Sequence, residues 1–363
     1  MRPDVSEGKV SKEVLVIGGG LIGLASAVAL ADRGVSVMLI GEHRAGEASP
    51  AAAGMLAPSV ERAAGPAHDF GIAARERYPS YIEFLADQSG VRVPLNRLGI
   101  LQVALSEAGV KGLGRTALPT SSWLDARELH ELEPALSHGL GAMYNPDDGA
   151  VDNTLLLEAL EKIVASSDHI EMIADSAVTI EPAQNSSSVK TISGSSHHAR
   201  HVVVAAGAWA GQIAGAPLAR AVTPARGQLV SYSVAPLRHV VYGPRGYVVP
   251  RGQGTIGGST MENAGFDATT TDEGIRKVRA ASEEICPHLT SAARVRSWAG
   301  LRPVTPDMLP LLGFDPEYPS VIYACGHSRN GVLTTPLTAD VVADLVTGTP
   351  LTHDLSQFRP GRF

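Results

Sequence analysis

Residues 14–40 contain the feature that most restricts how this chain can fold. The segment VLVIGGGLIGLASAVALADRGVSVMLI predicts a buried strand, a glycine turn, an apolar helix and a second strand. Gly18, Gly20 and Gly23 fit the pattern G-x-G-x-x-G, whose glycines allow a tight turn, backbone approach to a pyrophosphate, and close helix–strand packing. The helix N-terminus would add amide donors and a partial positive charge for the phosphates. The sequence therefore predicts a dinucleotide-binding unit in a Rossmann-like sheet.

Other classes of protein fit the chain less well. The uncharged stretch 14–31 has the length of a membrane span, and Gly19 and Gly23 form a small-xxx-small pair. The glycine triplet near its start favours strand, turn and buried helix instead. A net charge of −7 without a basic block argues against nucleic-acid binding. The two cysteines, Cys286 and Cys325, suit neither a disulfide framework nor a metal ribbon, which favours a reducing cytoplasm.

The second strand ends without the expected acidic residue. Dinucleotide sites usually place a carboxylate there to bind the ribose hydroxyls, but this strand ends in Ile40. Glu42 keeps the same side-chain parity if the chain stays extended, and Gly41 would let the backbone approach the nucleotide. Alternatively, His43 and Arg44 mark a site for an extra phosphate, as in an NADP-dependent reductase. The sequence alone leaves these options open.

The order of the remaining patterns indicates two domains. Parallel-strand signals recur at 202–207 and 321–346, whereas 221–265 has the alternation typical of antiparallel strands. This order predicts a nucleotide domain assembled from separated segments, with a second domain inserted. The predicted helices span 72–89, 125–133, 154–166, 271–285 and 336–347, and the predicted strands span 100–105, 169–173, 177–181, 189–192, 201–206, 228–234, 247–250, 255–259 and 321–325.

Two of these helices have clear terminal signals. Asp152 is the predicted N-cap of the helix at 154–166. The last helix is predicted to have Thr335 as its cap, Pro336 at its first position and Gly348 as its stop. Residues 184–198, rich in serine and histidine, predict an exposed hairpin tip.

Three features favour FAD over NAD(P) as the dinucleotide. The strand VVVAAG at 202–207 ends in Ala-x-Gly, which often marks a second backbone approach to FAD. The unit VIYACGHSRNGVLTTP at 321–336 resembles the element that closes over an isoalloxazine ring, where a helix N-terminus stabilises reduced flavin. The small-residue run AAAGM at 51–55 follows the βαβ unit, where a flavin needs a close wall.

Four segments resemble a known family. SPAAAGMLAP, VVVAAGAWAG, SWAGLRPVTPDMLPLLG and YACGHSRNGVLTTP are similar to the glycine oxidases of thiamine biosynthesis, within the D-amino-acid-oxidase superfamily. The likeness runs in order from about residue 14 to residue 346. It implies an α/β plus α+β fold, with a Rossmann-like FAD-binding domain (14–91, 150–220 and 298–346), an inserted substrate domain on a mainly antiparallel sheet (92–149 and 221–297), and tails at 1–13 and 349–363.

The resemblance also implies roles for individual residues. Arg302 would pair with the substrate carboxylate, Tyr247 would add a hydroxyl, and Arg329 would lie near substrate and flavin. A planar guanidinium suits this task because it donates two parallel hydrogen bonds to a carboxylate. Met55 and Met261 would shape the small pocket. The implied FAD contacts are Gly18, Gly20, Leu21, Ile22, Gly23, Gly41, Glu42, Ala48, Ser49, Ala53, Gly54, Met55, Val178, Gly207, His327, Ser328, Arg329, Asn330, Gly331, Val332 and Leu333.

The cofactor is expected to be non-covalent FAD. In the related sarcosine oxidases a cysteine anchors the flavin, and the matching position here is Gly300. The segment 326–330 superficially suggests a hydrolase elbow, but Asn330 replaces its last glycine. His197, His198 and His201 have no acidic or thiol partner in the sequence pattern that would indicate a metal site.

The implied reaction passes a hydride from a small amino acid or amine to flavin, leaving an imine, after which O2 is reduced to H2O2. Glycine, sarcosine and small D-amino acids are all candidate substrates. A dehydrogenase with a non-oxygen acceptor and a non-catalytic flavin-binding protein are alternatives. The oligomeric state stays open, a homo-oligomer included.

Overall fold

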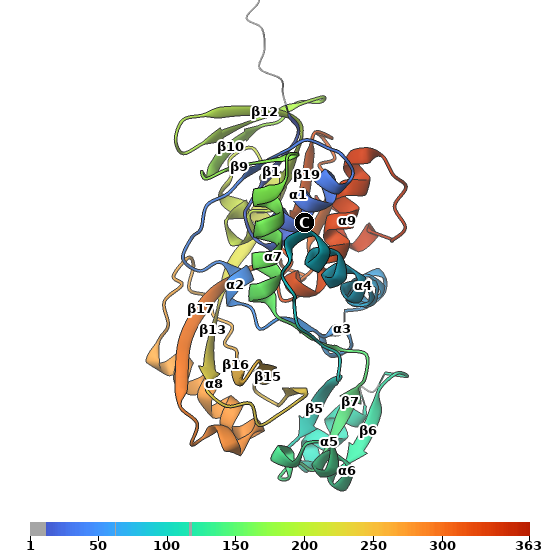
Figure 1. Ribbon diagram of the computed structural model, residues 1–363, viewed down its shortest axis with the longest axis vertical. Coiled ribbons are helices and arrows are strands. Elements are labelled where there is room, and N and C mark those ends of the chain that lie inside the picture. Colours follow the sequence, from blue (N-terminus) through green and yellow to red (C-terminus); the bar gives the residue numbers. More distant parts are fainter. Residues whose placement is uncertain (1–11, 62, 116–117) are drawn as a thin grey trace, which may run out of the picture.

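The computed structural model describes residues 12–61, 63–115 and 118–363. The predicted tail at 1–13 lies outside these residues, except for Lys12 and Glu13, which begin the first strand. Within the described ranges, no helix combines the length and apolar character that crossing a membrane requires. The chain forms two large sheets, one in the upper and one in the lower half of Figure 1, and a small third sheet.

The first sheet contains the predicted βαβ unit. β1 pairs in parallel with β2 and β12, β2 with β9, and β12 with β19. Residues 14–17 are buried because apolar clusters cover both faces of the sheet, as parallel sheets require. Its strands are β1 (Lys12–Ile17), β2 (Val37–Ile40), β9 (Ile170–Ile173), β10 (Ala177–Glu181), β11 (Ser187–Thr191), β12 (Ser196–Val204), β18 (Leu311–Phe314) and β19 (Val321–Cys325).

Four helices pack together on one face of this sheet (Figure 1). They are α1 (Leu21–Asp32), α4 (Pro66–Ser89), α7 (Asn153–Ser166) and α9 (Gly331–Thr347). The Asp152 side chain caps α7, as predicted, because its carboxylate accepts from the backbone N–H groups of Thr154 and Leu155 at 3.1 and 3.2 Å. The short helices α2 (Ala48–Ala51) and α3 (Pro58–Glu61) follow β2.

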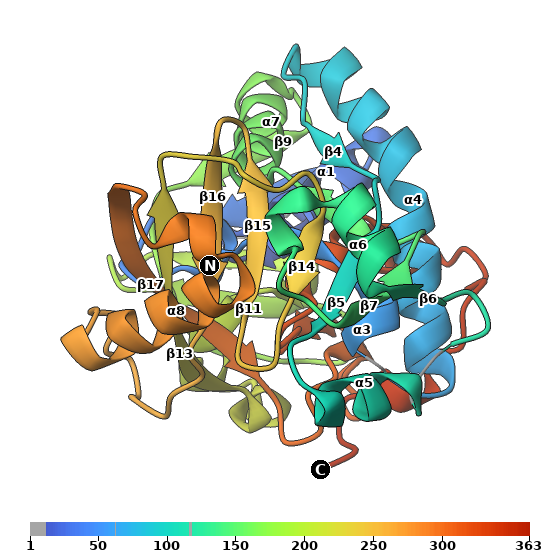
Figure 2. The same cartoon turned by 90° about the horizontal axis from the view of Figure 1, so that it is seen from below.

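The second sheet is antiparallel except for the pair of β14 with β5. Figure 2 shows α8 and α6 lying over its strands. In spatial order its strands are β17 (Arg294–Val304), β13 (Thr223–Tyr232), β16 (Gly254–Gly258), β15 (Tyr247–Arg251), β14 (Val240–Tyr242), β5 (Ile100–Ala104), β7 (Gly141–Asn145) and β6 (Ser122–Asp125). Its helices are α5 (Glu107–Gly114), α6 (Ala126–Leu132) and α8 (Asp272–Ile285), and the third sheet comprises β3 (Met55–Leu56), β8 (Gly149–Val151) and β4 (Leu95–Asn96).

This architecture confirms the predicted fold class, but two of the predicted domain limits do not match it. The limit at residue 298 falls inside β17, which stays paired with β13 as far as Val304. No turn interrupts that ladder, so the whole strand belongs to the second sheet. The predicted tail at 349–363 is also packed: the Phe358 ring is buried 5.0 Å from that of Phe70, and Arg362 donates to Asp307 at 2.8 Å.

The last helix begins earlier than predicted. α9 starts at Gly331, so Pro336 lies inside it. Proline has no N–H to donate to the carbonyl four residues earlier, which is that of Val332. The buried hydroxyl of Tyr78 on α4 donates to that carbonyl instead. A tertiary hydrogen bond therefore replaces the missing helical one, and the sequence pattern around Pro336 could not reveal it.

Two further limits were wrong. α4 begins at Pro66 rather than residue 72, with proline in the first turn, where its missing N–H costs nothing. The predicted hairpin tip at 184–198 consists largely of β11 and β12, and Ser187 and Ser188 are buried. Pairing with β10 and β12 covers β11, so the exposed parts of this segment are residues 184–186, in the turn before β11, and residues 192–195, in the turn after it.

Candidate active site

A continuous cavity extends from the carboxyl ends of β1 and β2 to the second sheet. At its first end it is lined by residues 18–22, Gly41 and Glu42, and at the other by Tyr247, Arg302 and Arg329. Ligands of open parallel sheets bind at this edge of the strands. One cavity therefore connects the glycine turn and Glu42 with Tyr247, Arg302 and Arg329.

The glycine turn forms a close-packed cradle at the first end. Gly18 has a φ of 122°, and a Cβ there would lie 2.3 Å from the carbonyl oxygen of Ala205. A Cβ on Gly23 would lie 1.8 Å from the oxygen of Gly18, so no larger residue fits between helix and strand. α1 begins with Gly20 as N-cap, no side-chain cap and no acid in its first turn. The N–H of Leu21 donates to the Ser49 hydroxyl at 3.0 Å, and the other N–H groups of this first turn are free to bind a phosphate.

Glu42, two residues beyond Ile40, lines the cavity. Its carboxylate accepts from the hydroxyl of Ser176, and the Arg44 guanidinium lies 3.4 Å away. Arg44 also donates to Ser176, while His43 lies 3.4 Å from the carboxylate of Glu47. The basic side chains proposed for an extra phosphate thus already face acids or hydroxyls. Ser176, buried and far away in sequence, carried no signal that could have identified it.

A second helix N-terminus reaches the cavity. Gly331 and Val332, the first residues of α9, line it, and the N-cap Asn330 makes no side-chain cap hydrogen bond. His327 lies just before this turn, and its Nε2 is 3.2 Å from the hydroxyl of Thr338. Burial lowers the pKa of His327 to about 3, so its imidazole is neutral at ordinary pH. The expected helix N-terminus is therefore present, although α9 starts five residues before the predicted position.

Arg302 and Tyr247 stand at the other end. Arg302, on β17, donates to the hydroxyl of Ser259 at 2.6 Å and to the carbonyl of Thr260 at 3.1 Å. A Cβ at Gly227 would lie 2.0 Å from Nη1 of this guanidinium, and one at Gly258 would lie 2.5 Å from the Tyr247 hydroxyl oxygen. Glycines on the neighbouring strands β13 and β16 thus make room for both functional side chains.

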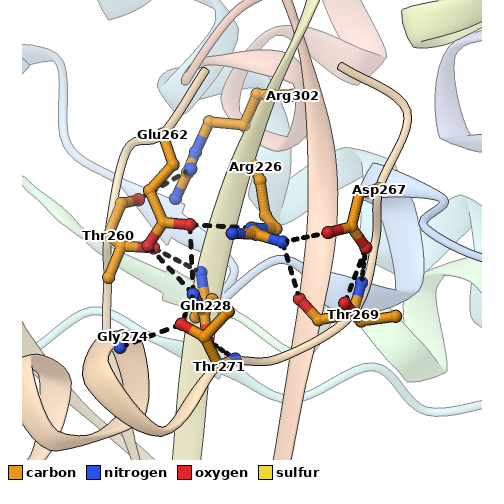
Figure 3. A network of polar contacts seen from close by, with 9 residues as sticks. All are labelled: Arg226, Gln228, Thr260, Glu262, Asp267, Thr269, Thr271, Gly274 and Arg302. Carbon is orange, nitrogen blue, oxygen red and sulfur yellow. Dashed lines mark hydrogen bonds and ion pairs between the residues drawn. The ribbon is translucent and has the colours of Figure 1, made fainter. Parts of the chain in front are cut away.

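A polar network holds the segment that orients Arg302 (Figure 3). Arg226 on β13 donates to Glu262 and to Asp267, both at 2.7 Å. Gln228 donates to Glu262 at 2.9 Å, and its backbone N–H donates to the hydroxyl of Thr260 at 2.9 Å. Burial opposes ionisation of Glu262, but hydrogen bonds, led by that of Arg226, hold its pKa below the ordinary value.

Sequence reasoning missed this network. Its local signal is a pair of polar residues two apart, Arg226 and Gln228, in the buried middle of β13. Their partners lie more than thirty residues further along the chain.

Arg329 forms an ion pair at the same end of the cavity. Its guanidinium donates to Glu61 at 2.7 Å, and the Tyr242 hydroxyl donates to the same carboxylate oxygen at 3.2 Å. Of the two predicted methionines, Met55 lines the cavity, whereas Met261 is 50% exposed and does not line it. The polar network holds the neighbouring Glu262, and the side chain of Met261 points to solvent instead of into the cavity.

Most of the predicted FAD contacts line the cavity, but three do not. Gly23 acts through helix–strand packing, Asn330 is the N-cap of α9, and Leu333 is buried in the core. Gly300, predicted at the covalent-anchor position, does line the cavity. No cluster of three or more metal-ligating side chains occurs in the described ranges.

This arrangement defines a dinucleotide-dependent enzyme whose second domain presents an arginine to the reacting end of the cavity. The family model "FAD dependent oxidoreductase" matches residues 13–345. The chain is 32% identical over 365 residues to the glycine oxidase of Geobacillus kaustophilus, covering 95% of this chain and 96% of that protein. The crystal structure of glycine oxidase from that organism superimposes with a TM-score of 0.89 at 31% identity, covering 97% and 99% of the two chains.

A longer relative matches as well. The chain is 34% identical over 370 residues to the bifunctional protein ThiO/ThiG of Synechocystis sp., covering 98% of this chain but 54% of that protein. It thus spans about half the length of such bifunctional relatives. The chain belongs to the DAO family of FAD-dependent oxidoreductases, and its cofactor is FAD.

The residues present fit this cofactor. The glycine cradle and the free N–H groups of α1 suit a pyrophosphate, and Glu42 offers a fixed carboxylate beside them. The N-terminus of α9 suits the charge of a reduced flavin.

Proposed function

We propose that this protein oxidises glycine, or a similarly small amino acid or amine, to the imine, with FAD as cofactor and O2 reduced to H2O2. The product would serve thiazole formation in thiamine biosynthesis. The observation that carries the proposal is the guanidinium of Arg302, which faces the cavity and, among the residues that the structure describes, donates only to neutral oxygens. Its positive charge is therefore available to a substrate carboxylate. The names of the relatives support the choice of glycine.

The side chains of this protein bind and orient the substrate. Arg302 holds the carboxylate, and the Tyr247 hydroxyl, above Gly258, adds a donor to it. Ser259 and Thr260 fix the guanidinium, so little orientational freedom is lost on binding. Bound FAD supplies the hydride acceptor. No catalytic base is required of the protein.

The first experiment is a visible spectrum of the purified protein, followed by anaerobic addition of glycine, sarcosine and D-alanine. Bleaching of the flavin band by one of these amines supports the proposal, and peroxide release in air then identifies O2 as the acceptor. Bleaching without peroxide would assign a dehydrogenase. A flavin that none of these amines bleaches would refute the proposal.

Arg302→Ala tests the assigned role. Loss of a charge-assisted pair to the substrate should raise KM for glycine about 10- to 100-fold, with a smaller change in kcat. Arg294→Ala, an exposed arginine on the same strand, is the matched control and should leave KM unchanged. An unchanged KM in Arg302→Ala would refute the assignment.

We also place the protein in the cytoplasm. Both cysteines are free and buried, which a reducing compartment preserves.

A further inference from the structure

Two arginines reach the substrate end of the cavity in opposite electrostatic settings. Arg302 donates only to the hydroxyl of Ser259 and the carbonyl of Thr260, and no carboxylate of the described residues lies within 4.0 Å of it. Arg329 donates to the carboxylate of Glu61 at 2.7 Å. The substrate end of the cavity therefore presents one uncompensated positive charge, on Arg302, and one that the fixed negative charge of Glu61 cancels.

Glu61 is held firmly in this position. It ends α3, its side chain is 16% exposed, and the Tyr242 hydroxyl donates to it at 3.2 Å. The Tyr242 ring packs against that of Tyr247, with centroids 5.6 Å apart. Burial opposes the charge on Arg329, but Glu61 more than offsets this and raises the pKa of that arginine. Glu61 thus lies in the same cluster of side chains as the residue proposed to contact the substrate.

This charge pattern matches an amine with one carboxylate. A second carboxylate on the substrate would enter a partly desolvated space that already contains the Glu61 carboxylate, and like charges repel strongly there. Arg329 could not compensate, because its charge is already balanced.

We propose that Glu61 is a specificity-determining residue that neutralises Arg329 and so restricts the site to monocarboxylate amines. The inference rests on the proposed function, since it assumes that an amino acid binds at Arg302. It assigns to Glu61 the rejection of dicarboxylates such as iminodiacetate, which is glycine carrying a second carboxymethyl group on nitrogen.

The test is Glu61→Gln in the FAD-loaded protein. Glutamine keeps an acceptor for Arg329 and Tyr242 but removes the negative charge. The ratio of kcat/KM for iminodiacetate to that for glycine should rise about tenfold or more, as one unmasked unit charge at short range predicts. Glu284→Gln is the matched control, because it frees Arg245, which lies outside the cavity lining, and should leave the ratio unchanged. An unchanged ratio in Glu61→Gln would overturn the inference.

A binding measurement separates this inference from the proposed function. Malonate and acetate are titrated into each variant while the flavin absorbance is recorded, which needs no turnover. The affinity for malonate relative to acetate should rise in Glu61→Gln even if the wild type oxidises none of the amines offered. If Glu61→Gln does not retain FAD, the variant Arg329→Gln leaves the Glu61 carboxylate unpaired and should lower the same ratio below that of the wild type. A ratio that does not fall would equally overturn the inference.

Discussion

The hydrogen bond between Tyr78 and the carbonyl of Val332 should stabilise the protein only because Pro336 follows. Tyr78 is fully buried and Val332 is 8% exposed, so water cannot replace the lost donor in Tyr78→Phe. The Thr335 hydroxyl cannot replace it either, because it donates to the Gly331 carbonyl at 2.7 Å. An orphaned buried acceptor costs about 1–3 kcal/mol of the free energy of unfolding.

The geometry of α9 predicts how the effects of Tyr78→Phe and Pro336→Ala on stability depend on each other. In Pro336→Ala the new backbone N–H can donate to the Val332 carbonyl, as in any α-helix. In that background Tyr78→Phe should therefore cost less than about 1 kcal/mol, and the two substitutions should couple by about 1 kcal/mol or more. Urea unfolding of the four FAD-saturated proteins, followed by circular dichroism, measures this cycle.

Tyr81→Phe is the matched control for that cycle. Tyr81 lies one turn further along α4, and its buried hydroxyl has no hydrogen-bond partner within the described part of the chain. Its removal should leave the stability unchanged or raise it. Equal costs of Tyr78→Phe in the two backgrounds would refute the claim that the hydroxyl replaces the missing helical bond.

Three other outcomes are expected. Glu262→Gln weakens the polar network that holds Thr260, an acceptor for Arg302, and should raise KM for glycine about three- to tenfold with little change in kcat. A constant KM in steady-state peroxide assays would contradict this prediction. Glu42→Gln should weaken FAD binding by the apoprotein about tenfold in a fluorescence titration; equal affinity would leave the backbone at Gly41 as the main partner of the ribose. Burial raises the pKa of Glu133, but hydrogen bonds, led by that of His239, outweigh this effect and hold the pKa below its ordinary value of 4.5. The ionised carboxylate therefore contributes fully to stability above pH 4.5, and this contribution is lost as the pH falls through the pKa of the folded state. Urea unfolding between neutral pH and pH 3 should show a shallower loss in Glu133→Gln than in the wild type, and equal slopes would contradict this assignment.

The sequence predicted the parts of this protein whose conformation is decided locally. The glycine cradle at Gly18 and Gly23 follows from steric exclusion within one βαβ unit, and the cap of α7 follows from the short reach of Asp152. The resemblance of four segments to a known family identified the family, the cofactor and the candidate residues Arg302 and Arg329. Both arginines line the cavity.

The tertiary structure decided what depends on partners distant in the chain. α9 extends back to Gly331 because Tyr78, 254 residues from Val332, supplies the donor that Pro336 lacks. Glu61 cancels the charge of Arg329 across 268 residues, whereas Arg302 stays uncompensated because its neighbours are a hydroxyl and a carbonyl. Local sequence determines which conformations and charges are available to each segment. Only packing decides which of them meet, because a hydrogen bond or an ion pair depends on distance in space rather than along the chain.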